Sequence, residues 1–540
     1  MASNSKSAVT ESTTRLAEKD DPVLSNLQDF IVRHGIYLSP SLSFRRVPGR
    51  GVGVYSTTRL RKGERIMDVP SSLLLTTASI PFNFAPKELR SKLPVHVLLA
   101  VYLAFGVSEQ KKQELQPWMA TWPKVQDFTE SMCLFWPEKT RKPVTVRTGR
   151  GDDHGHGDIS AGQKNKTATT SDQHITFRPV PQTLTGSWLG AREDGQILES
   201  EKPKFLDLQL AKFQSHIALA NQHFPTHLTK SALSSKASQP LTTFTHAWAN
   251  VNSRCFYHVA PGKRAPKDSN EAMAMVPAMD LFNHSHMANC NTSYDRKGFH
   301  VVTEQAISAG QELLLSYGAH SNDTLWTEYG FIMDPNGDDS IRGFDEVVLD
   351  GLTPIEMDVL EGVSYLGNYT LTAQGLCWRT EVVSWLGILS RNQWFRFIEG
   401  TLTPETIDRL HLQKTGNGSV KRRKGNNTTV AAQADVDVVL PSARARDKQI
   451  HWLTQLKTQA ELSVQGLTLL DQMASEKDLL DIFADVEELF KAQGFEKAQV
   501  DDMMRLQAKQ RRGMCLQRWS QILDTCRLGI EKLRKENTDK

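Results

Sequence analysis

The sequence has no long apolar run, no closely spaced cysteine pair and no excess of one charge, and each absence excludes a class of protein. No segment reaches the roughly 20 apolar residues that a membrane-spanning helix needs, and the polar N-terminus lacks the apolar core of a signal peptide. The six cysteines show neither the Cys-x-x-Cys spacing of a zinc site nor the density of a disulfide scaffold. We therefore expect a protein of the cytosol, the nucleus or both.

Charge and length narrow the partners and the size of the core. The 64 Lys and Arg residues nearly balance the 61 Asp and Glu residues, which gives a net charge of +3. A charge this small supplies no strong field for phosphate backbones or anionic lipids, so we expect no direct nucleic-acid partner and no membrane. With 540 residues, 39% of them hydrophobic, we expect roughly two to four domains in a monomer.

The first two thirds of the chain alternate between β-rich and helical patterns. After a disordered tail at 1–22, the β-rich segments 23–85 and 244–335 enclose a helical insert at 86–243. Within the insert, residues 141–200 are rich in Gly, Ser, Thr and charged residues. Such a tract cannot bury enough apolar surface to offset its ordering entropy, so we expect a disordered loop.

The last third of the chain predicts a helical domain. Residues 345–540 keep a helical apolar period, apart from a polar tract at 414–447 that we expect to be a second disordered loop. A short aromatic interval in this domain is typical of a core with grooves at its edges: Trp378, Trp385, Trp394, Phe395 and Phe397.

Two motifs inside the polar tracts carry weaker hypotheses. The basic run Lys-Arg-Arg-Lys at 421–424 is compatible with nuclear import or phosphate binding, although such runs are commonly only solvated. His154 and His156 offer metal ligands beside two aspartates, but a flexible tract would have to order around the ion. We therefore expect no metal.

Four separated stretches carry the chemistry. They are GRGVGVY at 49–55, NSRCF at 252–256, DLFNHS at 280–285, and LSYG at 315–318 followed by YGF at 329–331. Each is weak alone, because a glycine pair is usually an ordinary turn and a lone histidine is usually structural. Together, in this order, they resemble the SET-domain methyltransferases. The closer resemblance is to the subgroup of the Rubisco large-subunit methyltransferase and its non-histone relatives, over 23–540 without the two polar tracts.

This resemblance implies an α+β fold. The expected architecture is a β-rich SET fold with a pseudoknot, split by the helical insert and followed by an all-α substrate-binding domain. It also implies S-adenosyl-L-methionine as cofactor and methyl transfer to the side-chain amine of lysine in a non-histone protein. A ribosomal protein or translation factor is the expected target. No Gly-x-Gly-x-x-Gly opens a helix, so a Rossmann cofactor fold is not expected.

The resemblance assigns cofactor binding to residues of all four stretches. They are Arg50, Gly51, Val52, Gly53, Ser253, Arg254, Asp280, Asn283, His284, Tyr317 and Phe331. Glycines without Cβ let the backbone approach a ligand, and the guanidinium of Arg254 suits a carboxylate, with a surface salt bridge as the alternative. Asp280 could act as a general base, but we favour an anchoring role through hydrogen bonds.

Tyr317 is the predicted catalytic residue. Methyl transfer needs a hydroxyl near the sulfonium and the amine that orients the nucleophile without adding charge, although a buried core tyrosine is the structural alternative. Phe256, Tyr294 and Tyr329 are the predicted lysine channel. Aromatic faces attract the lysine cation by about 0.5–2 kcal/mol, and desolvation then favours the neutral amine. No metal and no covalent enzyme intermediate are required.

Two other functions are compatible with the same motifs. A histidine acceptor is one, because a member of this subgroup modifies histidine on the same scaffold. A catalytically silent scaffold that binds the cofactor and recruits partners through the helical domain is the other. The presence of Arg254, Asn283, His284 and Tyr317 favours an active enzyme, and the aromatic channel favours lysine.

Overall fold

The computed structural model divides the chain into two units. It describes residues 21–47, 49–147, 174–185, 187–188, 198–199, 203–228, 239–416, 439–472, 476–484 and 496–538. The first unit comprises Met1–Trp136, Gln209–Asp338 and Val486–Asp502, and the second comprises Pro137–Leu208, Asp339–Asp485 and Met503–Lys540. Residues 1–20 of the predicted tail, most of both polar tracts, the histidine pair and the basic run lie outside the described residues, whereas Pro22 already belongs to a helix.

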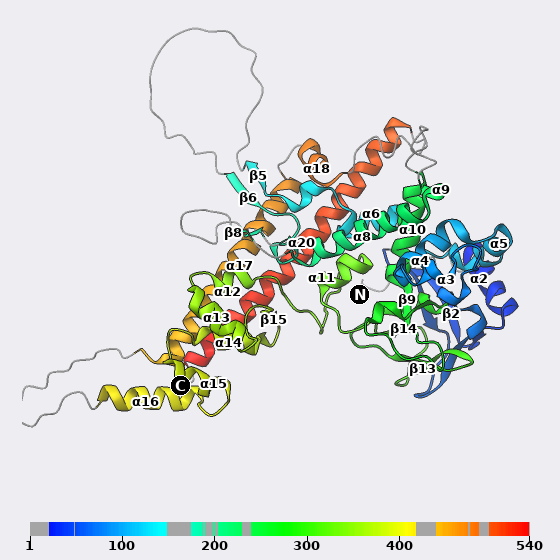
Figure 1. Cartoon of the computed structure of the whole chain (residues 1–540). Coiled ribbons are helices and arrows are strands. Elements are labelled where there is room, and N and C mark those ends of the chain that lie inside the picture. The colour runs from blue at the N-terminus through cyan, green and yellow to red at the C-terminus, as the bar shows by residue number, and fades with distance from the viewer. Residues whose placement is uncertain are drawn as a thin grey trace, which may run out of the picture. The chain divides into compact units, whose positions relative to one another are not determined.

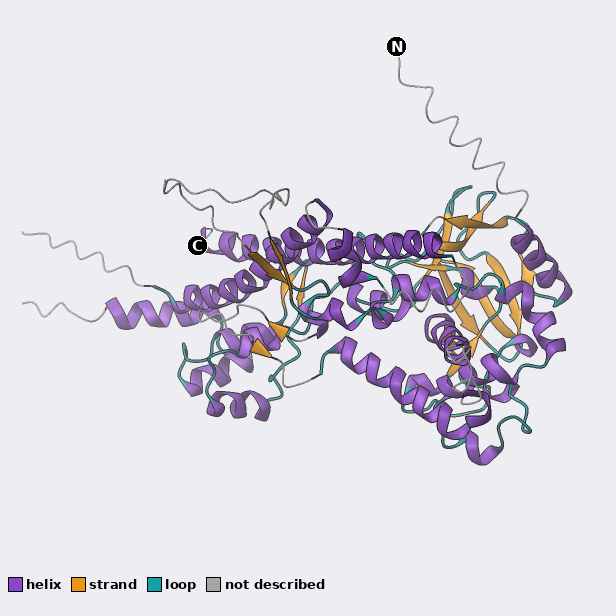
Figure 2. Ribbon diagram, turned by 90° about the horizontal axis from the view of Figure 1, so that it is seen from above, coloured by secondary structure: helices purple, strands orange, loops and turns teal. Residues whose placement is uncertain are grey.

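The first unit is built on two four-stranded sheets (Figure 1, Figure 2). One has the order β11-β14-β3-β2, formed by Asn283–His284, Glu312–Leu315, Gly51–Ser56 and Leu42–Val47, and only the β11–β14 pair is parallel. The other has the antiparallel order β1-β4-β13-β12, formed by Tyr37–Leu38, Arg65–Pro70, Gly298–Thr303 and Cys290–Tyr294. A short hairpin pairs β9 (Cys255–Tyr257) with β10 (Met273–Met275). Strands far apart in the sequence therefore meet in both sheets.

Helices supply the rest of the first unit. They are α2 (Pro22–Arg33), α3 (Lys87–Arg90), α4 (Val95–Val101), η3 (Tyr102–Gly106), α5 (Glu109–Met119), α6 (Val125–Ser131), most of α8 (Phe205–His223), α9 (Pro225–Leu228), α10 (Gln239–Arg254), α11 (Asn322–Thr324) and η8 (Leu325–Tyr329). Helix α10 packs on α4, where the His96 ring stacks on Trp248 with centroids 4.7 Å apart. This apolar contact fixes α10, whose last residue is the predicted site residue Arg254.

The second unit is mainly helical. Its elements are β5 (Val144–Arg147), β6 (His174–Phe177), α7 (Gln182–Thr185), β7 (Ser187–Trp188), β8 (Leu198–Glu199), α12 (Asp345–Leu349), α13 (Pro354–Gly362), β15 (Leu371–Thr372), β16 (Gly375–Leu376), α14 (Trp378–Ser384), α15 (Arg391–Ile398), α16 (Pro404–Gly416), α17 (Pro441–Gln472), α18 (Glu476–Phe483) and most of α20 (Lys497–Thr538). The β15–β16 hairpin corrects the all-α prediction, while the α+β class of the whole chain is confirmed.

The predicted insert at 86–243 is not one helical body within the first unit. Residues Pro137–Leu208 group with the second unit, and the β5–β6 hairpin packs there against α17. The contact is close, because a Cβ on Gly466 would lie 2.1 Å from the Phe177 ring. Apolar periodicity shows that a segment has a buried face, but it does not show which core receives that face.

Most of the predicted aromatic core of the second unit is buried. Trp385, Trp394 and Phe397 are each 2% exposed, whereas Phe395 is half-buried and Trp378 is 45% exposed. Trp378 still packs its ring on Phe397, with centroids 5.1 Å apart. The prediction of a core therefore holds for three of the five residues, and Trp378 is the exception at its edge.

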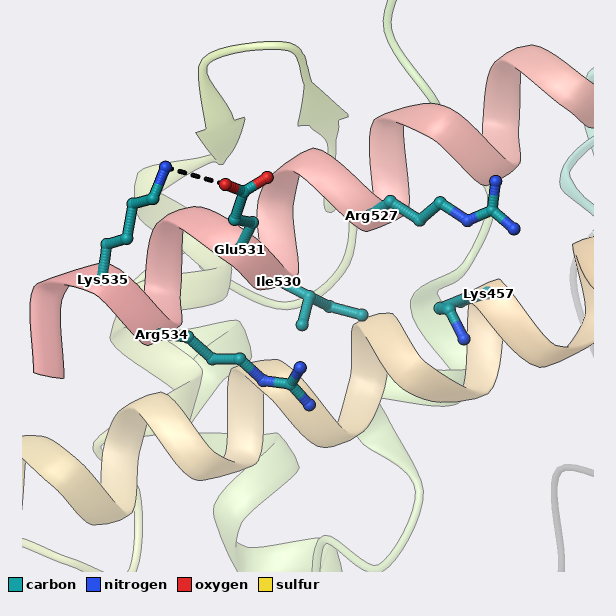
Figure 3. A pocket seen from close by; sticks show the side chains of 6 residues that line it. All are labelled: Lys457, Arg527, Ile530, Glu531, Arg534 and Lys535. Carbon is teal, nitrogen blue, oxygen red and sulfur yellow. Dashed lines mark ion pairs between the residues drawn. The ribbon is translucent and has the colours of Figure 1, made fainter. Parts of the chain in front are cut away.

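A cationic cavity of about 310 Å³ lies between α17 and α20 (Figure 3). Its lining residues are Lys457, Arg527, Ile530, Glu531, Arg534 and Lys535. Glu461 pairs with Lys457 at 3.0 Å and with Arg527 at 3.5 Å, and Glu531 pairs with Lys535 at 2.7 Å. These two carboxylates offset half of the charge of the four cations, and none of the predicted site residues lines the cavity.

Candidate active site

The glycine-rich stretch at 49–55 forms the entry into strand β3. Gly51 has a φ of +75°, a conformation that residues with a Cβ rarely adopt, so glycine allows the chain to turn there. Gly53 is needed for space, because a Cβ on it would lie 2.7 Å from Oε1 of Glu312 and 3.1 Å from Nδ2 of Asn283. The missing side chain brings the β3 backbone close to two polar groups. Val52, in contrast, is buried in the strand.

Glu312 on β14 connects two residues of the predicted cofactor set. Its Oε1 accepts a hydrogen bond from Nδ2 of Asn283 at 2.7 Å, and its Oε2 lies 3.1 Å from Nη1 of Arg50. The bond orients the amide of Asn283 so that its Oδ1 is left to accept a hydrogen bond from a ligand. Burial and the nearby Glu312 carboxylate raise the pKa of Tyr55. Sequence reasoning missed Glu312, although a lone acid in the apolar strand ELLL was an available signal.

A buried ion pair anchors the segment before β11. Nη1 of Arg254 lies 2.9 Å from Oδ2 of Asp280, and Nε1 of Trp118 donates to Oδ1 of Asp280 at 2.9 Å. The Asp280 side chain is fully buried and that of Arg254 is 15% exposed. Burial raises the pKa of Asp280, and Arg254 and Trp118 oppose that rise. Both Asp280 oxygens therefore have partners, an arrangement that suits an anchor better than a base.

His284 and Tyr317 are joined through the backbone. The N–H of Tyr317 donates to Nδ1 of His284 at 3.1 Å, which leaves the proton of the neutral ring on Nε2. Burial lowers the pKa of His284, so the ring stays neutral at pH 7. Among the described residues, Nε2 of His284 and Nε of Arg254 are buried donors without a hydrogen-bond partner.

The Tyr317 hydroxyl is held at the junction of these segments. It donates to the carbonyl oxygen of Phe282 at 2.8 Å, and burial raises its pKa to about 12. The hydroxyl is therefore neutral at pH 7. Because its proton is donated to Phe282, its lone pairs remain to accept a hydrogen bond from another group. The rings of His284 and Tyr329 lie 5.1 Å and 5.3 Å from the Tyr317 ring, and Phe331 lies 6.2 Å from Tyr329.

The three predicted channel residues fall into two aromatic groups. Tyr329 lies with Tyr317, as described above. Phe256 and Tyr294 instead meet through Phe299, whose ring centroid is 5.8 Å from the first and 5.2 Å from the second. No ring-to-ring contact joins the two groups within the described part of the chain. Phe299 was missed, because it lies on β13 outside every motif.

Ser253 is the predicted site residue whose side chain bonds within its own helix. Its hydroxyl donates to the carbonyl oxygen of Ala249, one turn earlier in α10, at 2.8 Å. Its proton is therefore not left for a ligand, although the hydroxyl oxygen can still accept a hydrogen bond. Asn252 beside it donates to the carbonyl oxygen of Glu328 at 3.1 Å and so connects α10 to η8. This second bond positions Tyr329, which ends η8.

These features fit the polar groups of S-adenosyl-L-methionine. A guanidinium nitrogen of Arg254 and the ring N–H of His284 are buried donors without partners, and Asn283 presents an oriented amide oxygen. The cradle above Gly53 lets the β3 backbone take part. A molecule with one carboxylate, one ammonium and a purine needs such a mixed set of donors and acceptors.

The described residues hold no group of three or more His, Cys, Asp or Glu side chains placed to bind a metal ion. No helix in the described part of the chain combines the length and apolar character that a membrane crossing requires.

Comparison with known proteins identifies one domain within the chain. Residues 51–318 match the SET domain, a range that begins in the first predicted β-rich segment and ends in the second. "Ribosomal lysine N-methyltransferase set11" of Schizosaccharomyces pombe is 30% identical over 140 residues, 26% of this chain and 35% of that relative. Human "SET domain-containing protein 4" is 22% identical over 379 residues, 68% of this chain and 73% of the relative. "Structure of Rubisco LSMT bound to AdoMet" aligns at 13% identity with a TM-score of 0.42, over 96% of this chain and 94% of that one.

Proposed function

We propose that this chain, whose residues 51–318 match the SET domain, is a protein-lysine N-methyltransferase. It would move methyl groups from S-adenosyl-L-methionine to the side-chain amine of lysine in a non-histone protein. The relative set11 is named for ribosomal lysine methylation, which supports a ribosomal protein as the target. The six cysteines are all free, which supports work in the reducing cytosol or nucleus.

The observation that carries the proposal is the position of Tyr317. Its hydroxyl is neutral, donates to the Phe282 carbonyl and lies against the rings of His284 and Tyr329. A hydroxyl with its proton already engaged offers lone pairs, which can accept a hydrogen bond from an incoming amine. That bond orients the amine without introducing a charge at the reacting centre.

The neighbouring residues supply binding and desolvation. Bound S-adenosyl-L-methionine provides a sulfonium-activated methyl group. We assign its carboxylate to Arg254, its ammonium to the free oxygen of Asn283, and its polar ring edge to the Nε2–H of His284. Aromatic rings including Tyr329 would receive the substrate side chain. Lysine has a pKa of about 10.4 in water, and desolvation between such rings favours the neutral amine that must attack.

The test is transfer of a labelled methyl group to proteins, followed by mass spectrometry of the labelled residue. The full chain is incubated with labelled S-adenosyl-L-methionine and either ribosomes or ribosome-free extract. We expect labelled lysine in the wild type and a rate at least about a hundredfold lower in Tyr317→Phe. Tyr369→Phe is the matched control, because its hydroxyl also donates to a backbone carbonyl, that of Tyr365, and burial also raises its pKa to about 12.

Each possible result has a defined meaning. Label on histidine would establish the alternative acceptor. Cofactor binding without labelling by wild type would leave a scaffold and refute the enzymatic proposal. If Tyr317→Phe and Tyr369→Phe both transfer methyl groups at the wild-type rate, the chain is an enzyme but Tyr317 has no role in its mechanism.

A further inference from the structure

The loop that joins β9 to β10 carries three exposed cations beside the aromatic residue Phe256. Lys263, Arg264 and Lys267 are all solvent-exposed, and none forms an ion pair with any residue that the structure describes. The loop starts directly after β9, and at its base the backbone N–H of His258 bonds the carbonyl oxygen of Ala272 at 2.9 Å. Its charges are therefore held near the end of the β9–β10 hairpin.

A second loop brings two more exposed cations to the same aromatic group. Arg296 and Lys297 form the turn between β12 and β13, and neither has an ion-pair partner among the described side chains. Asp295 in this turn accepts hydrogen bonds from the backbone N–H groups of Lys297 and Gly298, at 2.6 and 3.3 Å. The turn follows Tyr294 at the end of β12.

One hydrogen bond ties the two loops together. The backbone N–H of Val259, at the start of the first loop, donates to the Tyr294 hydroxyl at 3.2 Å. The His258 ring also lies 5.1 Å from the Tyr294 ring. Both loops therefore start next to residues of the group formed by Phe256, Tyr294 and Phe299.

Three arginines elsewhere in the same unit do have acidic partners. Arg46 pairs with Asp21, Arg50 pairs with Glu312, and Arg65 pairs with Asp68. Cations outnumber acids on both loops, and Asp268 in the first loop already accepts a bond from the backbone of Asn270. The five cations of the two loops face three exposed acids, Asp268, Glu271 and Asp295, so the loops keep a surplus of two positive charges.

We propose that these five cations select acidic residues next to the target lysine. The five are Lys263, Arg264, Lys267, Arg296 and Lys297. This inference rests on the proposed function, and it also takes the prediction from sequence that Phe256 and Tyr294 belong to the lysine channel. A peptide whose lysine enters the channel must lay its neighbouring residues across the two loops. Carboxylates there would satisfy the cations, whereas a basic neighbour would be repelled.

The same charges act on the target lysine. A positive surface disfavours the ammonium form of a nearby amine, so it promotes loss of the proton before entry. Acidic neighbours hold the peptide in place while the local field still favours the neutral nucleophile. A phosphate backbone could also meet this surface, but a lysine in the channel places protein, not nucleic acid, across the loops.

The experiment measures peptide binding to the full chain with S-adenosylhomocysteine present. The probes are fluorescent lysine peptides flanked by Asp and Glu, by Gln, or by Arg. We expect the acid-flanked peptide to bind wild type about fivefold more tightly than the Gln-flanked peptide, with the difference shrinking from about 50 mM to about 300 mM salt. The triple variant Lys263→Glu/Arg264→Glu/Lys267→Glu should reverse the order in favour of the Arg-flanked peptide.

The control is a second triple reversal with the same net charge. Arg59→Glu/Lys62→Glu/Lys92→Glu changes three exposed cations outside the two loops and should leave the wild-type order intact. Equal affinities of wild type for the acid- and Gln-flanked peptides, or no binding of either, would overturn the inference. A nucleic-acid result would also overturn it: wild type binds oligouridylate, the loop variant loses that binding, and wild type shows no preference among the peptides. Peptide binding is measured without methyl transfer. A negative labelling test therefore refutes the proposed function, whereas a negative peptide-binding test refutes only this inference.

Discussion

Replacing Asp280 with asparagine tests whether the buried ion pair anchors the site or takes part in the reaction. The substitution keeps the size of the side chain and removes its charge. Arg254 then keeps a guanidinium that is only 15% exposed, without the carboxylate that lies 2.9 Å away in the native protein. Trp118 also competes for the one remaining amide oxygen.

The expected magnitude follows from the geometry. At 2.9 Å two unit charges attract by about 6 kcal/mol at an effective dielectric constant of about 20, and the desolvation of both groups offsets part of this. Removing one partner of a buried pair costs about 3–5 kcal/mol. Because asparagine can still accept from Trp118 or Arg254, we expect Asp280→Asn to lower the free energy of unfolding by about 3 kcal/mol.

The assay combines urea unfolding with calorimetric binding of S-adenosyl-L-methionine. We expect a lower unfolding midpoint with an unchanged slope, and weaker cofactor binding because Arg254 is no longer oriented. Asp408→Asn is the control: this buried carboxylate accepts from the backbone and hydroxyl of Ser442, and its loss should leave cofactor affinity unchanged.

One outcome would refute this reasoning. If Asp280→Asn keeps native stability and native cofactor affinity but loses about a thousandfold in transfer rate, the carboxylate acts on the reacting groups. Asp280 would then be a general base, the alternative that the sequence left open.

Three further predictions concern the same unit. Glu312→Ala should raise the KM for S-adenosyl-L-methionine about tenfold with little change in kcat, and Glu312→Gln, which still accepts from Asn283, should recover most of it. Gly53→Ala should weaken cofactor binding at least about tenfold, whereas Gly362→Ala, which meets open space, should be silent in the same titration. Burial lowers the pKa of His216 to about 4, so the unfolded state binds more protons between about pH 6.5 and 4. Stability is present above that window and should fall by about 3 kcal/mol as pH decreases through it, and His216→Gln should flatten this difference in acid unfolding curves.

Sequence reasoning identified the residues whose proposed roles depend on local features, such as a missing Cβ or a short motif. Gly51 and Gly53 were identified because a missing Cβ has a local meaning: Gly51 has a positive φ, and a Cβ on Gly53 would lie 2.7 Å from Glu312. Asn283 and Tyr317 came from short motifs, and the structure brings both into one unit beside β14. Whether each residue performs its assigned task stays a prediction for the variants above.

The partners of these residues could not be predicted, because tertiary pairing chooses them. Glu312 meets Arg50 across 262 positions of sequence, and Trp118 meets Asp280 across 162. The register of β14 against β3 decides the first contact, and one residue of slip would turn Glu312 to the other face of the sheet. A sequence motif therefore predicts which residues contact a ligand, whereas the strand register determines which other residues hold those side chains in position. For this reason Glu312→Ala is the variant that tests the contribution of strand register. Glu312 belongs to no sequence motif, and its position beside Asn283 predicts a raised KM with kcat preserved.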